Sequence, residues 1–116
     1  MSEACGVLTT TAGEDEALAI SRGLVESHLA ACVQRLPMTS VYEWNGDVAE
    51  SAEVLLLIKT TVERYEAVEA WIGAHHSYEI PEILLLPASR GSLGYMEWVA
   101  RAVRADEGGP MVLSGG

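Results

Sequence analysis

The strongest constraint on the fold is a short segment, Val54–Ile58, that is apolar at every position (VLLLI). Successive side chains of a β-strand point to opposite faces of a sheet, so Leu55 and Leu57 would lie on one face and their neighbours on the other. A strand that is apolar on both sides has to be covered on both sides. The chain is therefore expected to form a sheet with a layer of protein against each face.

The first half of the chain predicts a strand, a helix and a hairpin. Residues 5–12 form an extended segment, and the three carboxylates of residues 14–16 stand where a helix would begin, which complements the helix dipole. Ala17, Ile20 and Leu24 recur at the spacing of one buried helix stripe. Asn45-Gly46 is a strong hairpin signal, and it joins two further extended segments.

The second half predicts a helix, a strand and a last helix. Thr60 and Glu63 match a capping box at the start of the first of these helices. A strand closed by Pro87 follows, and Ser92 is placed as the cap of the last helix. The order β-α-β-β-α-β predicts an α+β fold, the ferredoxin-like sandwich, with a C-terminal helix added. Residues 1–104 are expected to form a single domain, and residues 105–116 a disordered tail.

Two helices can cover only one face of a four-stranded sheet. The other apolar face needs a second covering layer, and another copy of the chain is the simplest candidate. We therefore expect an oligomer. Its contacts are expected to include Leu55 and Leu57 on the second face and the aromatic side chains of Trp44 and Trp98.

Charge and length limit the function classes. The chain has 7 Lys plus Arg against 17 Asp plus Glu, a formal net charge of -10, which opposes binding to nucleic acid or to an anionic membrane surface. Its apolar runs are far shorter than a membrane span, and no signal-peptide pattern is visible at the N-terminus. Two isolated cysteines are typical of a reduced compartment, so a cytoplasmic protein is expected.

Five segments together resemble the CutA family of divalent-cation tolerance proteins. They are LAACV (29–33), SVYEWNG (40–46), LLIKT (56–60), HHSYEIPEIL (75–84) and GYMEW (94–98). The resemblance implies a ferredoxin-like fold assembled as a homotrimer, and a role in tolerance of copper and other divalent cations. Such a trimer is also similar in architecture to the PII signalling proteins, which bind small ligands between subunits, but a shared architecture carries no function by itself.

Adjacent histidines at the expected end of a helix, His75 and His76, are the candidate copper ligands. Neutral imidazole suits Cu(II). Neighbouring helical residues diverge by about 100 degrees, however, so the two rings would not share a face. The alternative is that histidine stabilises the helix C-terminus, where the helix dipole favours it.

The resemblance also implies a third copper ligand, a cysteine at the end of the first strand, but Thr9 occupies that position here. A hydroxyl is a poor ligand for a soft ion, so tight Cu(I) binding is not expected. Cys5 lies too far back along the strand to replace it. Cys32 is interpreted as a small buried hydrophobe.

Lys59 suggests a different site, for an anion. It is followed by Thr60 and a helix start, and we expect residues 9–11 of the first strand to lie beside it. Tyr78, Glu79 and Glu82 could line the same site between subunits. The structural alternatives are that Lys59 pairs with a carboxylate and that proline fixes the entry into the fourth strand.

No catalytic motif of a familiar type is present, so the chain is not expected to be an enzyme. The leading interpretation is a trimeric protein that binds copper or another divalent cation. A PII-like sensor of a small anionic ligand and a structural trimer without any ligand are the alternatives. The expected partners are other copies of the chain and a divalent metal ion.

Overall fold

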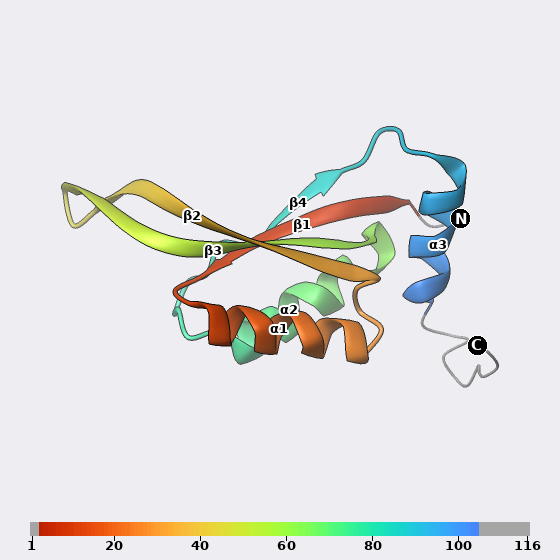
Figure 1. Ribbon diagram of the computed structural model, residues 1–116, viewed down its shortest axis with the longest axis horizontal. Coiled ribbons are helices and arrows are strands. Elements are labelled where there is room, and N and C mark those ends of the chain that lie inside the picture. The colour runs from red at the N-terminus through yellow and green to blue at the C-terminus, as the bar shows by residue number, and fades with distance from the viewer. Residues whose placement is uncertain (1–2, 105–116) are drawn as a thin grey trace.

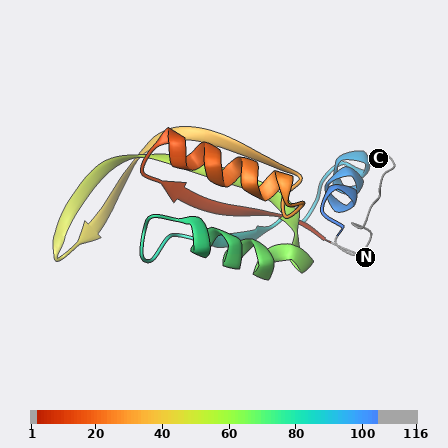
Figure 2. The ribbon, with the colours of Figure 1, turned by 90° about the horizontal axis from the view of Figure 1, so that it is seen from below.

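A computed structural model describes residues 3–104 of the chain and shows an antiparallel four-stranded sheet with two helices against one face (Figures 1 and 2). The strand order in the sheet is β2-β3-β1-β4. The elements are β1 (Ala4–Thr11), α1 (Glu14–Glu26), β2 (Cys32–Trp44), β3 (Asp47–Thr61), a 3-10 turn (Val62–Arg64), α2 (Tyr65–His75), β4 (Leu84–Pro87) and α3 (Leu93–Ala102). The predicted ferredoxin-like α+β fold with a C-terminal helix is confirmed. The tail predicted for residues 105–116 lies outside the described residues.

Helix α1 begins where the carboxylates predicted it. Gly13 precedes the helix and provides no side-chain cap, so the acidic first turn, Glu14 to Glu16, is the local feature that favours this start. The stripe of Ala17, Ile20 and Leu24 is buried against the sheet, as expected. Burial of one apolar stripe, more than a cap, therefore holds α1 in place.

The capping box predicted at Thr60 does not form. Thr60 still belongs to β3, and its hydroxyl donates to the carbonyl oxygen of Leu29 at 2.7 Å. The 3-10 turn starts after Thr61 without a side-chain cap, and α2 follows it. The prediction was wrong because the strand continues to Thr61 and takes the Thr60 hydroxyl into the core.

A long hairpin arm, made of β2 and β3, extends past the helices (Figure 1). Its turn has Asn45 at φ 53 and Gly46 at φ 85, the two positive values that a tight hairpin turn of this type needs. Strand β2 is an edge strand, with a hydrogen-bonded neighbour on one side only. An edge position tolerates Pro37, which has no backbone N–H to donate. Trp44, beside the turn, is 66% exposed.

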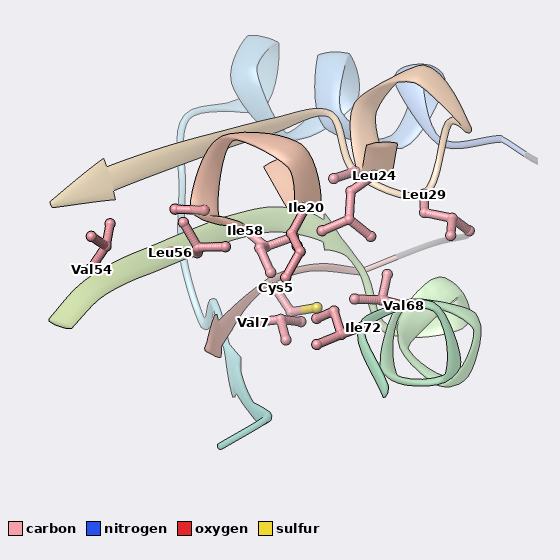
Figure 3. Close-up of a cluster of buried hydrophobic side chains, with 12 residues drawn as sticks. Cys5, Val7, Ile20, Leu24, Leu29, Val54, Leu56, Ile58, Val68 and Ile72 are labelled. Atoms are coloured by element: carbon pink, nitrogen blue, oxygen red, sulfur yellow. The ribbon is translucent and has the colours of Figure 1, made fainter. Parts of the chain in front are cut away.

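The core lies between the sheet and the two helices (Figure 3). Leu56 and Ile58 of β3 are fully buried there, together with Val7 of β1. Val68 and Ile72 of α2 are also fully buried. This face of the sheet is called the helix face below.

The opposite side, called the open face, carries apolar side chains that the protomer covers only in part. Leu55 and Leu57 point there and are half-buried, as the alternation predicted. Leu8 of β1 is also half-buried there. Three further leucines of this face are more exposed: Leu36 (60%), Leu84 (51%) and Leu86 (45%). Helix α3 packs near one end of the sheet, against β3 and β1 (Figure 2). Val99 of α3 and Val103, directly after it, are buried. Within residues 3–104, no helix is long and apolar enough to span a membrane.

Candidate functional site

His75, the last residue of α2, is an exposed histidine with a fixed ring. Its Nδ1 lies 2.7 Å from the carbonyl oxygen of Trp71, and the two rings stack with centroids 3.7 Å apart. A carbonyl oxygen only accepts hydrogen bonds, so Nδ1 carries a proton, and in the neutral ring the lone pair is on Nε2. This hydrogen bond to a carbonyl of the last turn stabilises the C-terminus of α2, which is the alternative role that the sequence suggested for histidine here. It leaves Nε2 available to a ligand.

Trp71, the ring under His75, rests on Gly23 of α1. A Cβ atom at Gly23 would clash with the outer ring carbons of the indole. The glycine therefore allows α1 and α2 to approach closely enough for the indole to lie between them. Since the indole is held in this way, the imidazole stacked on it is held too.

His76 is the opposite case, because its side chain is completely buried. Its Nε2 donates to the carbonyl oxygen of Thr10 at 2.7 Å, and its Nδ1 accepts from the backbone N–H of Tyr78 at 3.0 Å. Glu16 lies 3.5 Å from Nδ1, but a ring that accepts at Nδ1 and donates at Nε2 is neutral, so this contact is no ion pair. Neither ring nitrogen is free for a metal.

The segment that follows, Ser77 and Tyr78, is fastened to two other elements. The carboxylate of Glu16 on α1 accepts from the Ser77 N–H at 2.6 Å and from its hydroxyl at 2.9 Å. The Tyr78 hydroxyl donates to Glu53 of β3 at 2.8 Å, and Ser40 of β2 donates to the same carboxylate at 2.6 Å. Burial, and next the bond to Glu53, raise the pKa of Tyr78 to about 12. With His76, these contacts form a polar network that holds the entry to β4.

Sequence reasoning missed Glu16, Glu53 and Ser40 as members of this network. The only signal for Glu53 was a carboxylate directly before the apolar run of β3. Its partner Tyr78 is 25 residues away in the chain, so only the tertiary fold brings the two together.

Thr9 lies on the helix face, paired with Leu56, and is fully buried. Its hydroxyl has no hydrogen-bond partner among the described residues. What His76 contacts on β1 is the carbonyl of Thr10 rather than the side chain of Thr9. In residues 3–104, no three His, Cys, Asp or Glu side chains gather as a chelating group.

The two cysteines are unpaired thiols in different surroundings. Cys5 is buried on the helix face, and this burial raises the pKa of its thiol. Cys32 is only half-buried and lies on the open face, with its Sγ 3.6 Å from the Tyr95 hydroxyl. The interpretation of Cys32 as a buried hydrophobe was therefore too simple.

The predicted surroundings of Lys59 were wrong. Strands β1 and β3 are antiparallel, so Lys59 pairs with Gly6, and Thr9 to Thr11 lie beside Leu56 to Val54 instead. Thr60 points to the helix face and away from Lys59. Tyr78 contacts β3 at Glu53, six residues along the strand and about 20 Å from Lys59.

The remaining residues assigned to that site do not complete it in the protomer. Glu79 and Glu82 are exposed in the segment before β4. Lys59 itself donates to the side-chain oxygen of Gln34 at 3.0 Å and lies over the ring of Tyr95, with Nζ 5.7 Å from the centroid. Within residues 3–104 no ion pair of Lys59 with a carboxylate is seen.

The family model, the similar sequences and the similar structures all carry the name CutA or CutA1. The family model for the CutA1 divalent ion tolerance protein matches residues 5–102. Over 94 residues the chain is 43% identical to the divalent-cation tolerance protein CutA of Thermus thermophilus, an alignment that covers 80% of this chain and 91% of that protein. It is 45% identical over 85 residues to the CutA homolog of Xenopus laevis, covering 72% of this chain but 56% of that longer protein. The crystal structure of CutA1 from Oryza sativa has a TM-score of 0.86 at 34% identity, covering 89% of this chain and 95% of that chain.

Proposed function

This chain belongs to the CutA1 divalent ion tolerance family, and from that premise we propose that it acts by binding divalent cations, Cu(II) among them, through His75. The observation that carries the proposal is the state of the two histidines. Nε2 of His75 is exposed with its lone pair free, whereas both nitrogens of His76 are occupied inside the protein. The proposed metal site therefore contains His75 alone and not both histidines.

The expected affinity follows from the ligand set. One neutral imidazole is a good Cu(II) ligand, but a single protein ligand with water in the other positions binds weakly. Cu(I) prefers soft ligands, and the buried hydroxyl of Thr9 offers none. We therefore propose weak, exchangeable Cu(II) binding and poorer Cu(I) binding, without catalysis.

Calorimetric titration with Cu(II) tests this proposal. His75→Ala should abolish the Cu(II) binding seen in the wild type. His28→Ala is the control, because His28 is also an exposed histidine, on the turn after α1, and this variant should still bind Cu(II). Equal losses in the two variants would mean adventitious binding to surface imidazoles. Unchanged binding in His75→Ala would refute the role of His75.

We further propose that the protein acts as a homotrimer whose subunits cover one another's open face. The support is the apolar side chains of that face, Leu36, Leu55, Leu57, Leu84 and Leu86, of which three are at least 45% exposed in the protomer. Burial of such surface contributes about 25 cal/mol per Å². Trp44 and Trp98, which are 66% and 42% exposed, remain candidates for further contacts.

Sedimentation equilibrium of two leucine variants tests the assembly. Leu57→Asp should dissociate the trimer or unfold it, because a buried unpaired carboxylate costs several kcal/mol. Leu18→Asp is the matched control, since Leu18 is a 44% exposed leucine on α1. A wild-type monomer at micromolar concentration, or equal behaviour of the two variants, would contradict the trimer.

The free thiols of Cys5 and Cys32 support the further proposal that this trimer is cytoplasmic.

A further inference from the structure

The indole of Trp71 covers one side of the space in which His75 would hold a metal ion. The two rings are nearly parallel, with an interplanar angle of 17° and ring centroids 3.7 Å apart, so they lie almost directly over each other. An ion on Nε2 of His75 lies in the plane of the imidazole, about 2 Å from the nitrogen. It therefore lies next to the face of the indole as well.

The indole leaves little room on that side of the ion. The ligands of an octahedral ion stand about 2 Å from the metal, and they project from the imidazole plane on both sides. A ligand on the indole side would come within about 2 Å of the plane of the indole, whereas non-bonded atoms approach to about 3.5 Å. One coordination position of an ion at His75 is therefore obstructed.

Trp71 is held in place, so it does not make room by moving aside. Its outer ring carbons rest on Gly23 of α1, where a Cβ atom would clash with them. The side chain is only partly exposed and packs against the core. The helices that carry both rings lie on the other side of the sheet from the open face (Figures 1 and 2), so the proposed trimer covers a different surface.

From this stack we propose that Trp71 is a specificity-determining residue, which makes the His75 site favour Cu(II) over octahedral ions such as Ni(II). Cu(II) takes tetragonal coordination, in which the positions along one axis are long and weakly bound, so the obstruction of one such position costs it little. Ni(II) that keeps water as its other ligands has six of them at similar distances, and it would have to lose one. The inference rests on the proposed metal site at His75 and adds its selectivity.

His28 provides the reference imidazole, because Cu(II) binds more tightly than Ni(II) to imidazole in general. His28 is exposed, and none of the ring stacks among residues 3–104 involves it. The end of α2 lies beside the start of α1, where Glu16 bonds to Ser77, whereas His28 follows the end of α1. Since α1 has 13 residues, the rings of His28 and His75 are separated by about 20 Å and report separately.

NMR of the full chain, labelled with ¹³C at Cε1 of its three histidines, tests the selectivity. Cu(II) and Ni(II) are both paramagnetic, so a histidine signal broadens as an ion binds beside it. The ratio of Cu(II) to Ni(II) affinity at His75 should exceed the ratio at His28 by about tenfold or more. The ring of His76 is the control for the fold, because it is buried and its metal-free signal should keep its position in every variant.

Trp71→Leu removes the indole but keeps an apolar side chain and the backbone carbonyl that binds Nδ1 of His75. In this variant Ni(II) should bind more tightly at His75, and the affinity ratios at His75 and His28 should agree within about threefold. Trp98→Leu removes a 42% exposed indole elsewhere in the protein, and as the control it should change neither ratio.

Two results would overturn the inference while Cu(II) still binds at His75. One is an equal affinity ratio at His75 and His28 in the wild type. The other is an unchanged ratio at His75 in Trp71→Leu, which would mean that the indole only positions the imidazole. In both cases the proposed function stands, whereas a wild type that does not bind Cu(II) at His75 would overturn the inference and the proposed function together.

Discussion

His75 and His76 are neighbours in sequence and have opposite environments. His75 ends α2 with helical geometry, and its ring lies on the surface against Trp71. His76 has extended backbone angles, φ -93 and ψ 143, which turn its ring into the protein. The His75 ring bonds through Nδ1 alone, whereas both ring nitrogens of His76 are hydrogen-bonded.

The contrast teaches that residue type alone does not identify a ligand. Both imidazoles have the chemistry that Cu(II) favours. His76 uses that chemistry to hold the backbone of β1 and the segment before β4, because Thr10 and Tyr78 need its hydrogen bonds. Of the two, only His75 has a ring nitrogen without a partner among residues 3–104, which is why the proposed metal site rests on it.

The largest expected effect is on stability. His76→Ala leaves the Thr10 carbonyl and the Tyr78 N–H without their partner and empties a fully buried site, so we expect a loss of about 2 to 4 kcal/mol in the free energy of unfolding. His75→Ala removes one exposed hydrogen bond and should cost about 1 kcal/mol or less. Urea denaturation of the two variants measures the difference, and equal losses would show that the contrast between the histidines is wrong.

A smaller effect is expected from the support of the His75 ring. Gly23→Ala would push the indole of Trp71 out of place, at a cost of about 1 to 2 kcal/mol after the better helix propensity of alanine is included. Gly73→Ala is the matched control, because that glycine is also helical and a Cβ there meets nothing.

Thermal unfolding distinguishes the two glycine variants. Gly73→Ala should be neutral or slightly stabilising, by up to about 1 kcal/mol. If Gly23→Ala is as stable as Gly73→Ala, the close contact between α1 and Trp71 is not rigid, and the His75 ring is less well held than we infer.

The smallest effect concerns the network that surrounds His76. Tyr78→Phe removes the hydroxyl bond to Glu53 and should cost about 1 kcal/mol at neutral pH. The pKa of Tyr78 is raised from 10.0 to about 12, so the protonated phenol stabilises the fold below pH 10, and this contribution is lost as the pH rises toward 12. The stability difference between wild type and Tyr78→Phe should therefore shrink over that range. A difference independent of pH from 9 to about 12 would contradict the bond to Glu53.

Much of the fold could be predicted from local patterns. The alternation in Val54–Ile58 predicted that Leu55 and Leu57 share one face and their neighbours the other, and Asn45-Gly46 predicted the turn of the arm. Both are properties of consecutive residues, so the chain itself displays them. The capping box at Thr60 failed because a long-range bond to Leu29 uses its hydroxyl, and no local pattern contains that information.

The site was harder to predict because it depends on contacts between distant segments. The copper candidates were found as a pair, but which histidine is buried depends on where Thr10 and Tyr78 lie in the fold. The neighbours of Lys59 were predicted wrongly. Because β1 and β3 are antiparallel, the end of β3 lies beside the start of β1 and not beside its end. The contacts of Lys59 with Gln34 and Tyr95 join three elements and leave no pattern in the sequence.

The most direct test of the central claim is Cu(II) titration of the Trp71 fluorescence in a variant that carries Trp44→Phe and Trp98→Phe. Trp71 stacks on His75 with ring centroids 3.7 Å apart, so a paramagnetic ion at His75 should quench it strongly. We predict saturable quenching that disappears with His75→Ala and that persists with His28→Ala. Quenching that survives His75→Ala would contradict the account.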